Sequence, residues 1–244
     1  MANWSDPRMA APPHPATTAT HDAAFDAGLR KHMLSVYNYM ASGVLLTGVV
    51  ALGAALMGIP QQLFSGGNLL GYLVIFAPLI MVFFLMARVG RMSTGGMQAF
   101  FWSFAAIMGL SMSVIPMVYS GGSIATAFVG ASAAFVSLSL WGYTTKKDLS
   151  GFGTFLIMGV VGLIVAMIAN IFIQSTALDL AVSAIGVLLF AGLTAYDTQK
   201  IKSIYFQVAG TDMLGKTAIL GALTLYLDFI NMFQFLLSLI GNRD

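Results

Sequence analysis

The run TAILGALTLYLDFINMFQFLLSLI, residues 217–240, is almost wholly apolar and carries one carboxylate, Asp228, near its centre. A helix that crosses a membrane needs about 20 predominantly apolar residues, so this run predicts a transmembrane helix. A central aspartate costs about 3 kcal/mol, but each Leu, Ile, Phe and Met contributes about −0.3 to −0.6 kcal/mol, and together they outweigh it. We therefore expect a full span, with a re-entrant segment as the alternative.

The rest of the chain has the same character, with 58% hydrophobic and only 8% charged residues. Two stretches, 33–87 and 92–145, contain no Asp, Glu, Lys, Arg or His over 55 and 54 residues, and each is long enough for two spans. Breaks rich in Gly, Pro, Ser and Asn divide them at IPQQLFSGGN (59–68) and YSGGS (119–123). The continuous apolar runs exclude a β-barrel. The sequence predicts an all-α polytopic membrane protein with seven transmembrane helices, near 34–59, 69–88, 97–118, 123–144, 152–174, 178–200 and 217–240.

Residues 1–28 differ in composition, because they are rich in Pro, Ala and Thr and show no apolar periodicity. We interpret them as a mobile cytoplasmic tail that precedes a seven-helix transmembrane domain at 29–244. The first 25 residues lack the apolar core of a signal peptide, and the run that begins near Leu34 is long enough to remain as a span. Cysteine is absent, so no disulfide can form.

The basic residues predict the orientation. Ten of the eleven lie before the first helix or in alternate loops, and the intervening loops have none. The positive-inside rule makes that side cytoplasmic, so the N-terminus is expected in the cytoplasm and the C-terminus outside. Arg243 is the exception. The ten are Arg8, Arg30, Lys31, Arg88, Arg91, Lys146, Lys147, Lys200, Lys202 and Lys216.

Several kinds of chemistry are disfavoured. The three histidines, His14, His21 and His32, lie in the tail, where we expect them to be solvated, or at the start of the first helix, so the membrane region offers no base to a serine nucleophile. The chain has no Glu, and no His, Cys and Glu set for zinc. Lys216 is too close to a helix end for a retinal Schiff base. No phosphate-binding loop GxxxxGK[ST] is present. We expect no enzyme, no cofactor and no nucleic-acid partner.

The remaining chemistry is that of carboxylates. Two helices carry a narrow polar stripe at helical spacing, and each stripe must face protein or water. If the stripes face each other, Asp197 and Asp228 line one pocket that is reached from the cytoplasm. The first stripe is Ser183, Gly186, Phe190, Thr194 and Asp197, and the second is Gly221, Thr224, Asp228, Asn231 and Phe235.

Each of these residues also has a purely structural interpretation. A protonated Asp228 can hydrogen-bond its neighbours, and Asp197 can reach headgroup water. Asp197 nevertheless opposes the helix dipole by roughly 0.3–1 kcal/mol, so local helix energetics do not explain it. Arg88 and Arg91 serve as orientation signals, with pairing to a carboxylate as the alternative.

Four segments are similar to one known family: AGLRKHMLSVYNYM (27–40), GYTTKKDLSGFG (142–153), FAGLTAYDTQKIK (190–202) and GALTLYLDFINMF (221–233). They resemble the Bax inhibitor family, or transmembrane Bax inhibitor motif proteins, in its bacterial form, over residues 27–242. The resemblance implies a central seventh helix between two layers of three helices. It also implies multi-pass insertion in a bacterial inner membrane.

The resemblance further implies a pH-sensitive calcium leak controlled by a pair of aspartates that match Asp197 and Asp228. Arg88 or Arg91 would latch onto the first aspartate. Two carboxylates in a low-dielectric site titrate as a unit, which suits a pH switch. With Thr224, Asn231 and water they offer calcium, the permeant ion, only a weak and transient site, in a pocket that Thr194 also lines. The alternative is a non-enzymatic regulator that binds a membrane complex such as a quality-control protease. Expected partners are membrane lipid and such a membrane protein.

Overall fold

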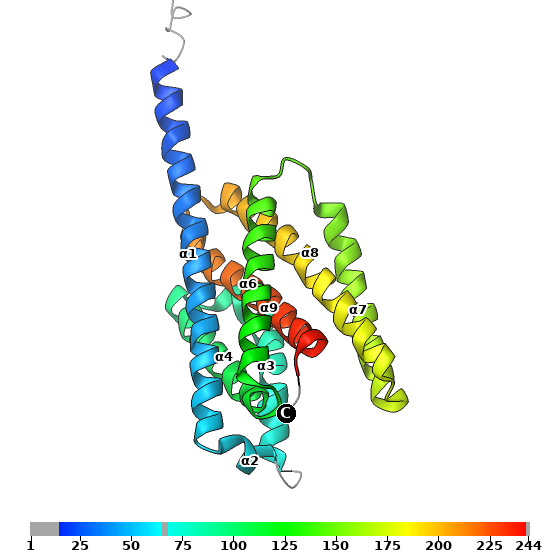
Figure 1. Cartoon of the computed structure of the whole chain (residues 1–244). Coiled ribbons are helices and arrows are strands. Elements are labelled where there is room, and N and C mark those ends of the chain that lie inside the picture. The colour runs from blue at the N-terminus through cyan, green and yellow to red at the C-terminus, as the bar shows by residue number, and fades with distance from the viewer. Residues whose placement is uncertain (1–14, 65–67, 243–244) are drawn as a thin grey trace, which may run out of the picture.

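The computed structural model describes the backbone of residues 15–64 and 68–242, and the side chains of these residues from Phe25 onwards. This part of the chain is helical (Figure 1). Its elements are α1 (Pro15–Leu56), α2 (Ile59–Phe64), α3 (Leu69–Arg88), η2 (Val89–Arg91), α4 (Thr94–Ser111), η3 (Met112–Val114), α5 (Ile115–Val118), α6 (Gly121–Thr144), α7 (Ser150–Ile173), α8 (Thr176–Val208) and α9 (Met213–Ile240).

Seven segments in the described part of the chain are long and apolar enough to cross a membrane, which confirms the predicted number of spans. Several begin at a polar residue that the sequence places directly before an apolar run. The side chains of Asn68, Ser93, Ser120 and Ser175 each accept a hydrogen bond from a backbone N–H in the first turn of α3, α4, α6 and α8. Such caps satisfy donors that have no partner within the helix.

The α9 helix is the central element. Half of its most apolar window is buried, against 11% of the α7 window. It packs against α1 and α4 on one side and against α6 and α8 on the other. On the first side α4 also contacts α1 and α3, and on the second α8 also contacts α6 and α7. This is the expected arrangement of a central helix between two layers of three.

The C-terminal end of α9 lies against the turn before α6. The Ser120 N–H donates to the carbonyl of Asn242, and the Asn242 N–H donates to the Ser123 hydroxyl. This turn joins the third and fourth spans, so α9 ends on the face opposite the basic loops. The contact supports a full span and not a re-entrant segment.

The helices α8 (Thr176–Val208) and α9 (Met213–Ile240) are both longer than the predicted 178–200 and 217–240. The loop expected at 201–216 is a short turn, in which Gly210 has a φ of 78°, because α8 continues to Val208. Its extension is buried at Ile201 and Tyr205, one and two turns after Asp197. The ring of Tyr205 lies 5.3 Å from that of Phe25 on α1. Long-range packing of this kind stabilises a helix that local sequence leaves undecided.

The predicted boundary at residue 28 does not coincide with a structural boundary, because α1 begins at Pro15. The N-terminal part of α1 projects beyond the other helices (Figure 1). Proline is well suited to the first position of a helix, and no Gly or Pro follows it before Gly28. Residues 1–14 of the predicted tail lie outside the described residues.

Candidate functional site

Asp228 is placed in the middle of the bundle by α9. It is 4% exposed, and its neighbours Leu225, Tyr226 and Phe229 are buried as well. Thr224 and Asn231, one turn before and after it, each donate a side-chain hydrogen bond to the carbonyl four residues earlier. These two polar side chains are therefore satisfied within their own helix, and Asp228 depends on other helices for its partners.

Asp197 on α8 supplies that partner. It is 8% exposed, and a side-chain hydrogen bond joins its carboxyl group to that of Asp228. Two ionised carboxylates only accept hydrogen bonds, so this contact requires one proton on the pair. Lys200, one helical turn further along α8, acts electrostatically on Asp197 and lies over the Tyr196 ring at 5.8 Å. The structure thus brings together the two aspartates that the sequence singled out.

Small residues allow the two helices to approach. A Cβ added to Gly186 of α8 would come within 2.6 Å of the Phe235 ring on α9, and one added to Gly221 of α9 within 3.0 Å of Ile201 on α8. Contacts this short leave no room for a larger side chain. At these positions α8 and α9 therefore lie at close range, and this approach accompanies the contact between the carboxyl groups.

One oxygen of Asp228 stays available. Its Oδ2 is buried and has no hydrogen-bond partner within the described residues. A buried polar atom without a partner is costly and marks a place where an ion or water is expected. The described residues contain no group of three or more His, Asp or Glu side chains arranged to hold a metal. The pair by itself offers a cation two carboxylates.

Asn231 connects the pair to a cavity. It lies one turn beyond Asp228 on α9 and lines a cavity of about 700 Å³ between α3, α4 and α9. Ser111, Tyr119 and Gln234 add polar groups to this cavity, and its other walls are apolar. Of the other two residues expected in the pocket, Thr194 is fully buried and donates to the Phe190 carbonyl, and Thr224 is half-buried. The cavity lies toward the end of the bundle opposite the basic loops.

The two candidate latch residues lie away from the pair. Arg88 and Arg91 are exposed, and the Arg88 guanidinium lies 5.7 Å from the centre of the Phe84 ring on its own helix. Within the described residues the charged groups that act on Asp197 are Lys200 and Asp228. An arginine latch is therefore not formed in this conformation, and both the latch and the choice between Arg88 and Arg91 stay predictions.

Sequence reasoning missed a chain of hydroxyl groups beside the pair. Tyr37 on α1 lies 2.6 Å from Ser139 on α6, and Ser139 lies 2.9 Å from Thr198 on α8. Thr198 is fully buried and follows Asp197 in the sequence. Single hydroxyl residues in apolar helices are common, so only their meeting in space distinguishes these three.

His32 is buried against α8, which the sequence did not indicate. It belongs to the first candidate span and is 5% exposed, with its ring 5.4 Å from that of Tyr205. His32 therefore lies near the start of the first candidate span, where the sequence analysis placed it, but its side chain is buried. The spacing of Leu29, His32, Met33 and Val36, all of them buried, is the helical pattern that could have revealed it.

Comparisons with known proteins agree with this architecture. The family model described as "Inhibitor of apoptosis-promoting Bax1" matches residues 29–244. The uncharacterized protein RP147 of Rickettsia prowazekii is 44% identical over 229 residues, which cover 93% of this chain and 96% of the relative. The inner membrane protein YbhL of Escherichia coli is 45% identical over 219 residues, covering 89% and 94%. An uncharacterized protein of Caulobacter vibrioides is 44% identical over 235 residues, covering 91% and 93%.

The family match spans nearly the whole described chain, and the relatives align along almost their full lengths. The seven apolar helices, with α9 at their centre and the two aspartates in contact, are thus the fold of an integral membrane protein of the Bax inhibitor family, to which this chain belongs.

Proposed function

We propose that this protein is a pH-sensitive calcium leak channel of a bacterial inner membrane, and that the Asp197–Asp228 pair controls it. The observation that carries the proposal is the hydrogen bond between the two buried carboxyl groups. A buried pair of acids is costly to build and has no evident structural purpose at the meeting point of two helices. It is therefore the natural place for a function.

The pair supplies the pH dependence. With one shared proton the carboxyl groups attract each other through a hydrogen bond, and without it two negative charges repel across the same short distance. Loss of the proton therefore pushes α8 and α9 apart at this level. Acids coupled in this way titrate as a pair, so the response belongs to both residues.

The cavity at Asn231 supplies part of a path. It approaches the pair within one turn of α9, about 5 Å of helix rise. The unpartnered Oδ2 of Asp228 is a negative group that a cation coming from this side could meet. Calcium takes six to eight oxygen ligands, and two carboxylates with water hold it weakly, which suits passage more than storage.

The membrane is inferred from the similarity to YbhL, and the orientation within it from the basic residues of the loops. YbhL is an inner membrane protein, and we assign the same membrane to this chain. From the basic residues of the loops we expect the N-terminus and Asp197 to lie toward the cytoplasm. The cavity at Asn231 then faces the other side, so the pair lies between the two.

Reconstitution tests the proposal. The purified full-length protein is inserted into vesicles that contain a calcium indicator, and calcium entry is followed over a series between about pH 5 and 8. We expect entry above that of protein-free vesicles, with a rate that changes across the series. Entry equal to that of protein-free vesicles at every pH overturns the proposal and favours the alternative of a non-conducting regulator.

A further inference from the structure

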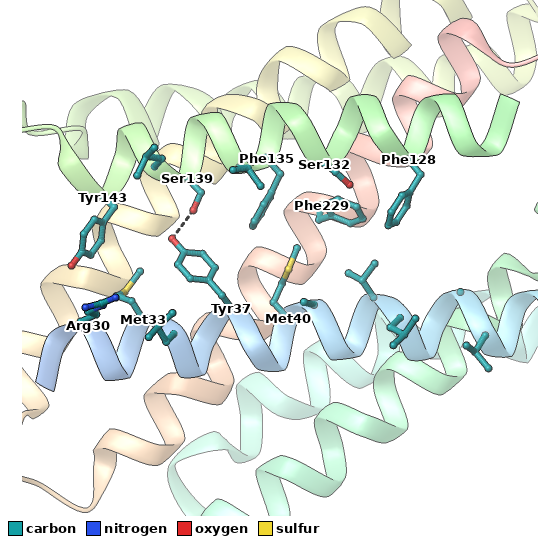
Figure 2. Close-up of a pocket in the computed structure, with 18 of the residues that line it drawn as sticks. Arg30, Met33, Tyr37, Met40, Phe128, Ser132, Phe135, Ser139, Tyr143 and Phe229 are labelled. Carbon is teal, nitrogen blue, oxygen red and sulfur yellow. Dashed lines mark hydrogen bonds between the residues drawn. The ribbon is translucent and has the colours of Figure 1, made fainter. Parts of the chain in front are cut away.

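A second feature of the structure lies on the surface, between α1 and α6. A groove of about 960 Å³ runs between these helices, with Phe229 of α9 at its floor. Figure 2 shows Met33, Tyr37 and Met40 of α1 facing Phe128, Phe135 and Ser139 of α6 across it. The volume is at the upper end of the range of about 300–1,000 Å³ for small-molecule sites.

The groove opens toward lipid. Leu45 and Val49 on its α1 edge are 68% and 61% exposed, and Val136 and Leu140 on its α6 edge are 65% and 62% exposed. Exposed Leu and Val in the middle of membrane spans contact acyl chains. The hydroxyl groups of Tyr37 and Ser139 inside the groove are hydrogen-bonded to each other at 2.6 Å. Each of these two hydroxyl groups therefore has a hydrogen-bond partner within the protein. The lining therefore suits a hydrocarbon chain and not water.

One end of the groove is positively charged. Arg30 lines this end and also borders a second cavity, of about 580 Å³, that contains Lys31, Ser35 and Asn38. No carboxylate lines either of these two cavities. Within the residues whose side chains the structure describes, neither Arg30 nor Lys31 has an acidic partner. Two unpaired cations at the entrance of an apolar groove are complementary to an anionic headgroup with an acyl tail.

The dimensions are consistent with such a ligand. The groove follows α1 from Arg30 to Leu52, which is about 33 Å at 1.5 Å per residue. One leaflet occupies half of the roughly 30 Å hydrocarbon core, so an acyl chain that enters beside Arg30 lies within the groove over its full length. Basic pockets between helices at the cytoplasmic side are recognised sites for anionic lipid headgroups.

We propose that the α1–α6 groove binds one anionic phospholipid, with the phosphate between Arg30 and Lys31 and an acyl chain along Tyr37, Val44 and Phe135. The site is separate from the aspartate pair and does not depend on the calcium proposal.

Native mass spectrometry of the full-length protein tests the site. The protein is taken from vesicles that contain equal amounts of phosphatidylglycerol and phosphatidylcholine, and the lipids that stay bound are counted. We expect retained phosphatidylglycerol to exceed phosphatidylcholine at least about fivefold, the contribution of one basic residue near the surface. Equal retention of the two lipids by the wild type overturns the proposal.

Charge variants locate the headgroup. Arg30→Gln with Lys31→Gln is expected to remove the preference for phosphatidylglycerol, whereas Lys146→Gln with Lys147→Gln, at exposed loop positions, preserves it. Reporter fusions first establish that the orientation is unchanged, because these residues also act as topology signals. A preference that survives the first pair of substitutions contradicts the proposal.

Glycine variants locate the acyl chain. Gly48 lines the groove, and a Cβ added there meets no atom within 4 Å, so Gly48→Leu directs a larger side chain into the groove from an open position. Gly53 on the same helix has the same free space and does not line the groove, which makes Gly53→Leu the matched control. We expect Gly48→Leu to lower lipid retention at least about fivefold and Gly53→Leu to leave it unchanged. Should Gly48→Leu fail to insert, Ala41→Leu at the exposed edge of the groove replaces it. Wild-type retention in the inserted groove variant refutes the site.

Discussion

The hydroxyl oxygens of Ser139 on α6 and Thr198 on α8 lie 2.9 Å apart. Thr198 directly follows Asp197 in the sequence. Tyr37 of α1 extends this contact to a third helix at 2.6 Å from Ser139. The helix turn that carries Asp197 is therefore held by α1 and α6 as well as by α9. Movement of the aspartate pair requires this hydroxyl chain to break or to move with it.

Thr198→Val tests that coupling, because it keeps the shape of the side chain and removes its hydroxyl. The hydroxyl of Ser139 keeps its contact with Tyr37 but loses the one with Thr198, so we expect a loss of about 1–2 kcal/mol in the free energy of unfolding. The midpoint of the calcium leak along the pH series should shift although both aspartates remain. Thr126→Val is the control, since Thr126 is exposed on α6 and bonds only within its own helix. An unchanged pH profile in Thr198→Val means that the chain is only structural.

The aspartates themselves give the sharpest test of the proposed function. Asp197→Asn or Asp228→Asn removes one of two coupled charges, so the remaining acid no longer faces a negative neighbour. We expect the midpoint of the leak to move to lower pH by about one unit or more. Asp212→Asn is the control, because Asp212 is exposed and makes no cap hydrogen bond. Hydrogen bonds from Ser150 lower the pKa of Asp148. This acid, in the loop before α7, therefore stays ionised throughout the pH series. Wild-type profiles in both pair variants reduce the aspartates to structural polar groups.

Close packing of α8 on α9 predicts a stability difference among glycines. Gly186→Ala forces a Cβ against the Phe235 ring, and overpacking of this kind costs about 1–3 kcal/mol. Gly162→Ala on α7 has no atom within 4 Å of the added Cβ, so it should be neutral or slightly stabilising. Thermal unfolding in detergent measures both. Equal melting temperatures for the two variants would show that the helices are less closely packed than the structure indicates.

An arginine latch requires a second conformation, in which Arg88 or Arg91 reaches Asp197. If such a latch closes the path, Arg88→Gln or Arg91→Gln raises the leak at rest and weakens its response to pH. Lysine rescues incompletely, because it keeps the charge and loses the bidentate geometry. The measurement is vesicle leak, after orientation has been checked. Wild-type behaviour in both single variants and in the double variant leaves the arginines as topology signals only.

Topology can be checked independently of any activity. Reporter fusions in the turns at 145–149 and 209–212 should be cytoplasmic, and a reporter after the last residue should lie outside. The contact of Asn242 with the turn before α6 requires a reporter in that turn to lie on the same side as the C-terminus. Opposite locations for these two reporters contradict the full span of α9.

The sequence by itself determined the number of spans and their approximate limits, and it singled out the two acids that meet in the structure. These are local properties, because an apolar run of about 20 residues predicts a membrane span wherever it occurs in the chain. An aspartate within such a run is rare and can be recognised without knowledge of the tertiary structure. The stripes on the last two spans contain Gly186 and Gly221, which lie where α8 and α9 approach each other, but Asn231 of the second stripe faces a cavity against α3 and α4. The family resemblance, now confirmed by the match over residues 29–244, added the order of the layers.

Only the tertiary structure decided the rest. The carboxyl contact, the hydroxyl chain between Tyr37 and Thr198, the burial of His32 and the groove beside Arg30 join residues that are far apart in the sequence; Tyr37 and Ser139, for example, are 102 positions apart. The extension of α8 to Val208 likewise depends on packing against Phe25 of α1. Such contacts are set by how closely the helices approach and at which angle they cross. Those quantities arise from the fit of whole helix surfaces to one another, and no local pattern of residues encodes them.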